Sequence, residues 1–195
     1  MKKYIIANFF FLIIVILQLS SCASINYKKL SIENPAALIA IEDSLLLVNK
    51  NNQSVNQAIV GANNNVATNY LNNDELSFAV EHFKKAISID PDNKDSQFGL
   101  MIAEGRILIK RGNKNGIWDA IERFSKASLI YPNKGDPFYW IAISYTKLGD
   151  TEFDLILESY EKSLSLELDE NIKADAEKNY EKAKSRKNKL DSFWK

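Results

Sequence analysis

The order of apolar and polar residues divides the chain into an apolar first segment and a long helical remainder. An almost unbroken apolar run extends from Ile5 to Leu19. Beyond it, apolar residues recur every three or four positions, which is the period of an amphipathic helix. Strand-like alternation is absent from the sequence, so the pattern predicts an all-α fold. The expected helices cover 35–49, 54–72, 75–90, 95–111, 116–131, 136–148, 152–167 and 170–193.

Capping residues support these helix boundaries. Asn34 stands before Pro35, which suits an N-cap followed by proline in the first turn. Ser54, Asp74 and Asp136 suit the same capping role. We therefore expect each helix to begin close to one of these residues.

The first segment has the layout of a secretory signal. Lys2 and Lys3 precede the apolar run, and the small residues Ser20 and Ser21 follow it. A membrane-spanning helix, the alternative, needs about 20 apolar residues, which is more than this run provides. Leu19-Ser20-Ser21-Cys22 then resembles the lipobox of bacterial lipoproteins, in which the cysteine is diacylated and the chain is cut before it.

That resemblance implies an address for the protein. Two acyl chains hold a protein stably on a membrane, whereas an incidental free thiol at Cys22 would not. Ala23 follows the cysteine in place of the Asp that retains some lipoproteins at the inner membrane. We expect a signal peptide over 1–21, a lipidated Cys22 with a flexible tether over 22–34, and a helical domain over 35–195 on the periplasmic face of the outer membrane.

The helical remainder contains a repeat. A small or aliphatic residue is followed by an aromatic residue four positions on and by Ala or Ser three positions later, which places all three on one helix face. The three copies are Ala79/Phe83/Ala86, Ala120/Phe124/Ala127 and Ile156/Tyr160/Ser163. Each copy also has Glu four residues before Lys, at Glu81/Lys85, Glu122/Lys126 and Glu158/Lys162.

Partner helices and closing prolines complete the repeat. Upstream of the third copy lie Ile141-Ala142, Tyr145 and Leu148-Gly149-Asp150, and Pro91 and Pro132 close two copies. This pattern resembles the tetratricopeptide repeat, a helix-turn-helix unit. The intervals between copies exceed the family period of about 34 residues. The resemblance implies an α-solenoid with repeats at about 54–93, 94–134 and 135–168, and with capping helices at 35–49 and 170–193.

The resemblance also implies a function. The first helices of successive tetratricopeptide pairs line a concave groove that holds a segment of a partner protein. The corresponding positions here are Asn64, Thr68, Asn72, Phe98, Ile102, Arg106, Tyr139, Ile143, Thr146 and Lys147. The alternative is that they form ordinary surface between helices. We expect a non-enzymatic adaptor in an envelope complex, and the competing hypothesis is a ligand-binding accessory lipoprotein of a solute transport system.

Composition limits the chemistry available to the chain. It has 25 basic and 25 acidic residues, so its charge gives no bulk attraction to nucleic acid. Removal of the signal would take away Lys2 and Lys3 but keep Cys22 as the sole cysteine, which leaves no intramolecular disulfide. The one histidine, His82, is expected on the surface, and neither a zinc ligand set nor a catalytic cluster is visible. We therefore expect no metal, no cofactor and no hydrolase activity.

Two further features are the tryptophans and the cations of the last helix. Trp118 and Trp140 fall inside predicted helices and are expected in the core. The last helix carries a cluster of cations, which suits a solvated helix end or a docking patch for an anionic lipid or an acidic partner. These cations are Lys182, Lys184, Arg186, Lys187 and Lys189.

Overall fold

The computed structural model describes residues 26–49, 51–149 and 152–193. The predicted signal peptide and Cys22 lie outside the described residues. Within those ranges the backbone is helical apart from turns and one isolated bridge between Lys134 and Glu167. The helices are α2 (Tyr27–Glu33), α3 (Pro35–Ile39), α4 (Glu42–Val48), α5 (Gln53–Asn72), α6 (Leu76–Ile89), α7 (Lys94–Arg111), α8 (Lys114–Ile130), α9 (Asp136–Leu148), α10 (Phe153–Leu164) and α11 (Glu170–Phe193).

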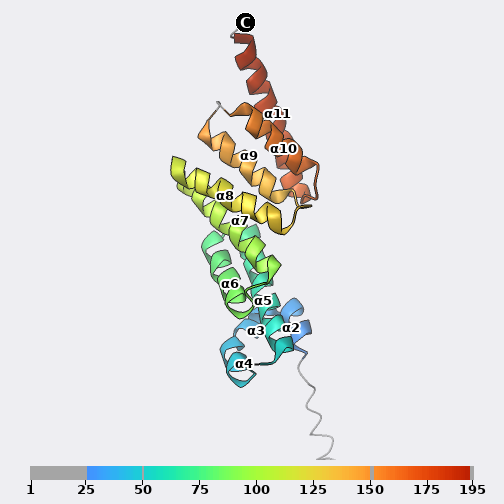
Figure 1. Cartoon of the computed structure of the whole chain (residues 1–195). Helices are drawn as coiled ribbons and strands as arrows, with labels where there is room; N and C mark the ends of the chain where they lie inside the picture. The colour runs from blue at the N-terminus through green and yellow to red at the C-terminus, as the bar shows by residue number, and fades with distance from the viewer. Residues whose placement is uncertain (1–25, 50, 150–151, 194–195) are drawn as a thin grey trace, which may run out of the picture.

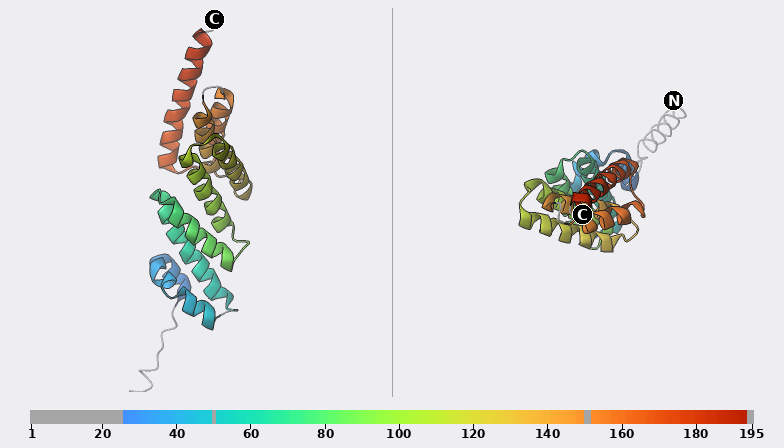
Figure 2. Two further views of the ribbon diagram at one scale, coloured as in Figure 1. Left: turned by 90° about the vertical axis from the view of Figure 1, so that its left-hand side faces the viewer. Right: turned by 90° about the horizontal axis from the view of Figure 1, so that it is seen from above.

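These helices stack in chain order into an α-solenoid. Three helix pairs, α5/α6, α7/α8 and α9/α10, each pack within the pair and against the next pair. Figure 1 shows α2, α3 and α4 gathered at one end and α11 at the other, and the left view of Figure 2 agrees. The end of α11 extends beyond the other helices. The predicted fold class, an all-α solenoid of TPR-like helix-turn-helix repeats with terminal caps, is confirmed.

The repeat residues form the core where neighbouring helices meet. Phe83, Phe124 and Tyr160 are at most 2% exposed, and the alanines of the motif are fully buried. The two phenylalanine rings lie against glycines of α7. An ideal Cβ added to Gly99 would lie 2.2 Å from the Phe83 ring, and one added to Gly105 would lie 2.4 Å from the Phe124 ring. Since packed carbon atoms stand about 3.5–4.0 Å apart, only glycine lets both rings seat against α7.

Surface positions agree with the repeat register, with one exception. The exposed pairs Glu81/Lys85 and Glu122/Lys126 form ion pairs one turn apart. The prediction that Trp118 belongs to the core is wrong, because this side chain is 45% exposed. It lies in the first turns of α8, where its ring makes an edge contact with Tyr145. Trp140, by contrast, is half-buried and packs against two core clusters.

The N-terminal cap differs from the prediction in two places. The flexible connection expected over 22–34 is wrong for Tyr27–Glu33, which form α2 with Asn26 as N-cap. This helix packs on α5, where the Asn65 side chain donates to the Ser31 carbonyl at 2.9 Å. The single helix expected over 35–49 is two helices, α3 and α4, with a turn at Ala40 and Ile41. The turn places the Glu42 carboxylate against α5.

A buried polar network fixes that turn. Asn63 is fully buried, and its Nδ2 donates to Glu42 Oε2 at 2.8 Å and to the Ile59 carbonyl at 3.1 Å. Its Oδ1 lies 2.8 Å from His82 Nδ1, so the histidine must donate through that nitrogen. His82 is therefore half-buried and hydrogen-bonded, and the prediction of a plain surface histidine is wrong.

Candidate functional site

The first helices of the three pairs line a concave pocket together with the start of α11. We call this pocket the inner hollow; its volume is about 520 Å³. Its rim residues Asn72 and Asp169 are exposed. The lining residues are Asn72 of α5, Arg106 of α7, Asp136, Tyr139 and Trp140 of α9, and Asp169, Ile172 and Asp175 in and just before α11.

Arg106 links three helices beside the hollow. Its guanidinium donates to the Leu71 carbonyl at 3.0 Å and to Asp74 Oδ1 at 2.9 Å, at the end of α5. The same group lies 4.6 Å from the centroid of the Trp140 ring on α9. A cation at that distance from an indole face is attracted by the ring electrons. Arg106 of α7 therefore connects the end of α5 to α9.

Tyr139 and Asp175 join α9 to α11. The Tyr139 hydroxyl donates to Asp175 Oδ2 at 2.6 Å, and Asn179 Nδ2 donates to the same oxygen at 2.6 Å. Burial raises the pKa of Tyr139, and the bond to the carboxylate raises it further, so the phenol stays protonated at physiological pH. The Tyr139 ring also makes an edge contact with Trp140, with centroids 4.9 Å apart.

Charge in the hollow is predominantly acidic. The lining contains the carboxyl groups of Asp136, Asp169 and Asp175 and one guanidinium, that of Arg106. Burial raises the pKa of Asp136, whereas a backbone hydrogen bond and the charge of Lys134 lower it, and the Asp169 carboxylate raises it to a smaller degree. A nearby cation would stabilise the charged form of the Asp136 carboxyl group.

Gly135 explains how Asp136 comes to lie there. An ideal Cβ on Gly135 would lie 2.4 Å from the Ser163 carbonyl oxygen. Its N–H also donates to the Glu167 carbonyl at 2.7 Å. Because glycine has no side chain, the turn before α9 can pack directly against the backbone at and just after the end of α10. This packing brings Asp136 close to Asp169.

The structure brings three of the ten predicted groove residues together in the hollow. Asn72, Arg106 and Tyr139 line it. On α5, Thr68 is exposed, whereas Asn64 is half-buried and bonds to residues of the α6–α7 turn and α7. On α7, Ile102 is 4% exposed and belongs to the core.

The remaining predicted residues lie elsewhere. Phe98 makes an edge contact with Tyr131 and lies 4.9 Å from Lys134 Nζ. Lys147 is exposed near the end of α9. Ile143 and Thr146 line a small space between α9, α10 and α11, of about 60 Å³.

Sequence reasoning missed the contribution of α11 to the hollow. Asp169, Ile172 and Asp175 come from the segment interpreted only as a polar cap. One signal for their role was available, because Ala176, Tyr180 and Ala183 continue the repeat spacing. Ala176 and Ala183 are buried where α11 packs on α10 and α9.

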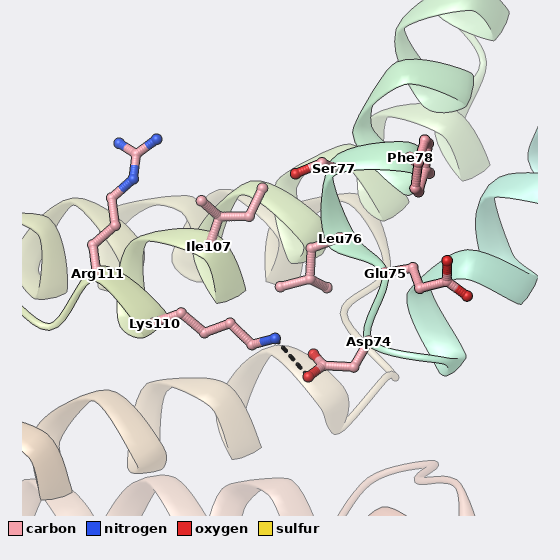
Figure 3. Close-up of a pocket in the computed structure, with 8 residues that line it drawn as sticks. All are labelled: Asp74, Glu75, Leu76, Ser77, Phe78, Ile107, Lys110 and Arg111. Atoms are coloured by element: carbon pink, nitrogen blue, oxygen red, sulfur yellow. Dashed lines mark hydrogen bonds and ion pairs between the residues drawn. The ribbon is translucent and has the colours of Figure 1, made fainter.

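A second pocket lies between the start of α6 and the end of α7, with a volume of about 460 Å³. Figure 3 shows Lys110 directed at Asp74 across it, while Arg111 points away from the pair. Lys110 Nζ and Asp74 Oδ2 are 2.5 Å apart, and this bond lowers the pKa of Asp74. Asp74 has φ 63°, the left-handed conformation of a residue just past a helix end, so it is not the N-cap that we predicted. Because its central charges neutralise each other, this pocket is the weaker candidate.

The described ranges contain neither a metal-binding cluster nor a membrane-spanning helix. Nowhere in them do three or more His, Cys, Asp and Glu side chains form a group that could hold a metal ion. None of the helices described has both the length and the apolar character needed to cross a membrane.

Comparisons with known proteins add little to this description. Neither a protein-family model nor a curated protein matches the sequence. Among solved structures, the chain is similar to MamA AMB-1, at 18% sequence identity over 72% of this chain and 89% of that chain, with a TM-score of 0.27. A similarity this weak carries no argument about function. The class of the protein, a TPR-like α-solenoid, therefore rests on its own helix packing and repeat motif.

Proposed function

We propose that the protein is a lipid-anchored adaptor of a bacterial envelope complex, and that it holds a segment of a partner protein in the inner hollow. The observation that carries this proposal is the lining of the hollow by α5, α7, α9 and α11 together. A segment laid across these helices would contact all of them at once. Solenoid repeats use extended concave surfaces of this kind to bind other proteins.

The lining also favours a chemistry for the partner. With Asp136, Asp169 and Asp175 against Arg106, the hollow is suited to a segment that carries Lys or Arg. Trp140 and Ile172 offer apolar surface beside these carboxylates. A volume of about 520 Å³ admits one or two side chains of such a segment.

The membrane anchor is the second part of the proposal. It rests on the resemblance of Leu19–Cys22 to a lipobox behind an apolar signal. Diacylation of Cys22 would hold the solenoid at a membrane surface, and Ala23 favours the periplasmic face of the outer membrane. The adaptor would then present its hollow to partners in the periplasm.

The alternative, a solute-binding accessory of a transporter, has less support. Small-molecule sites usually enclose about 300–1,000 Å³ and bury most of their ligand. The small space beside Ile143 and Thr146 has about 60 Å³, too little for a solute. The larger hollow has the exposed side chains of Asn72 and Asp169 at its rim. Such a surface suits a chain segment better than an enclosed small molecule.

The test is a pull-down of the anchored protein from its native envelope after mild crosslinking. The hollow variant combines Asn72→Arg with Asp169→Lys, which adds bulk and reverses charge at exposed rim positions. Its matched control combines Gln57→Arg with Asp92→Lys, also at exposed positions but outside the hollow. We expect the hollow variant to lose the partner and the control to keep it, with similar denaturation midpoints. A partner retained by both variants would refute the groove.

A Cys22→Ala variant tests the anchor separately. We expect the wild-type protein to sediment with membranes and to carry acyl chains at Cys22. The variant should be recovered without acyl chains and should lose its envelope partners. Wild-type protein with an unmodified thiol would contradict the lipoprotein assignment while leaving the groove proposal to its own test.

A further inference from the structure

The short helix α4 exposes large apolar side chains to solvent. Leu47 is 76% exposed and Val48 is 83% exposed, and Ile41 just before the helix is 41% exposed. Leu45 and Leu46 instead pack against the core cluster of the N-terminal cap. Scattered apolar residues are ordinary on protein surfaces, but Leu47 and Val48 are adjacent at a helix end, and Ile41, the N-cap of α4, stands about two turns before Val48 on the same side. We call Ile41, Leu47 and Val48 the cap patch.

The cap patch lies at the end of the solenoid where the described chain begins. In Figures 1 and 2, α4 is at the extreme end opposite the C-terminus, and α2 lies at this end too. Asn26, the residue before α2, is four positions after Cys22, so the two can be at most about 14 Å apart. Helix α5 alone, with 20 residues, is about 30 Å long. An anchor at Cys22 would therefore keep this end, and not the whole molecule, beside the membrane.

Charges near the cap patch are compatible with a lipid surface. On α2, Lys28, Lys29 and Ile32 are exposed, and Lys29 Nζ lies 3.7 Å from the carboxylate of Glu33, which is exposed too. Lysine side chains at a bilayer surface extend their ammonium groups to the headgroups while their stems contact apolar surface. On α4, Glu42 is turned into the protein and bonded to Asn63, so that Asp43 is the acidic side chain left exposed on this helix.

From this placement we propose that the cap patch docks on the lipid bilayer, with Leu47 and Val48 inserted at the boundary between headgroups and acyl chains. The inference rests on the proposed acylation of Cys22, which brings the cap to the membrane. Docking would orient the solenoid, with the cap on the bilayer and α11 directed away from it. The inner hollow, between α5 and α11, would then stand off the membrane and remain accessible to a partner.

The test measures the environment of a label on α4 in the anchored protein. Because Cys22 would be acylated, a second cysteine provides the one reactive thiol of the chain. Val48→Cys and Leu129→Cys are labelled with a polarity-sensitive fluorophore in the full-length lipidated protein. Leu129 on α8 is the matched control, since it is 79% exposed and lies outside the cap. The proteins are reconstituted in phosphatidylethanolamine and phosphatidylglycerol vesicles, with or without brominated acyl chains. Leu47→Cys replaces Val48→Cys if the latter changes the helical circular dichroism.

We expect brominated lipid to reduce the fluorescence at position 48 by about twofold or more and to leave position 129 unchanged, as for a side chain at the acyl boundary. Equal quenching at the two positions overturns the docking. Protection of position 48 from aqueous iodide without quenching by brominated lipid also overturns it, because a second copy or another protein would then cover the patch. If either of these results is found with protein that floats with the vesicles, the docking is refuted but the lipid anchor is supported. Protein that does not float refutes both the anchor and the docking.

Discussion

Gly99 and Gly105 on α7 allow a sharp test of the packing. Each faces a buried phenylalanine ring, Phe83 on one side and Phe124 on the other. Glycine in a helix interior is normally unfavourable, and its replacement by alanine stabilises an exposed helix by about 1 kcal/mol. At these two positions we expect the opposite sign, because the added methyl group would overlap a ring.

The magnitude follows from the contact distances. The new Cβ atoms would lie 2.2 Å from the Phe83 ring and 2.4 Å from the Phe124 ring. Either the ring or α7 must therefore move by more than about 1 Å to restore ordinary contact. Overpacking a core costs about 1–3 kcal/mol, and a displacement this large in fully packed surroundings belongs at the upper end. After subtraction of the helix-propensity gain, each alanine variant should lose about 2 kcal/mol of unfolding free energy.

Gly61 provides the matched control for this experiment. It also lies inside a helix, α5, but its ideal Cβ would be 3.6 Å from Ser31 Oγ, an ordinary contact. Gly61→Ala should therefore stabilise the protein by up to about 1 kcal/mol. The assay is urea unfolding followed by circular dichroism for all three variants. If Gly99→Ala and Gly105→Ala were as stable as Gly61→Ala, the close seating of both rings on α7 would be refuted.

Three further changes test other contacts. Ala127→Leu, at a fully buried crossing, should cost about 1–3 kcal/mol of stability in the same urea assay, and an unchanged midpoint would contradict the repeat register. Tyr139→Phe removes the hydroxyl that donates to Asp175, so it should cost about 1 kcal/mol and increase hydrogen exchange at the start of α11; unchanged exchange there would contradict the link. Burial lowers the pKa of His82 below 6.5, and the charge of Lys85 lowers it further. At a pH near or below 6.5 the unfolded chain therefore binds more protons than the folded chain, and the unfolding free energy should fall as the pH drops below about 6.5. His82→Gln should reduce this pH dependence, measured as the difference between thermal melts at pH 7 and pH 5.5.

The helices of the repeats were predictable because each is amphipathic in itself. All the predicted helices from 54–72 onward are confirmed, with ends within three residues of those observed. Apolar spacing acts over a single helix and can be read from neighbouring positions. The predicted N-caps were less successful: Asn34 caps α3, but Asn52 and not Ser54 caps α5, and Gly135 and not Asp136 is the N-cap of α9. The aromatic and small residues of the motif, such as Phe124 and Ala127, are buried as the repeat register requires.

The contacts that the sequence did not reveal are those between distant segments. His82 is half-buried between α6 and α5, where it donates to Asn63 and its ring stacks on Tyr70. Trp118 has an apolar side chain inside a helix, yet it falls on the solvent side of α8. Asp175 enters the candidate site because α11 packs on α9, which its polar composition did not indicate. Each outcome depends on which helix faces which, and a local pattern does not contain that information.

Helix α7 connects the packing of the solenoid to the proposed site. Gly99 and Gly105 let the neighbouring helices seat their rings on it closely. Arg106 follows Gly105 directly and reaches both the end of α5, at the Leu71 carbonyl, and the Trp140 ring of α9. A wider spacing of the pairs would break one of these contacts, since a guanidinium cannot span a larger gap with both bonds intact. The small residues that make the core dense therefore also set the width of the inner hollow, and an extra methyl group at Gly105 would change the shape of the site as well as the stability of the fold.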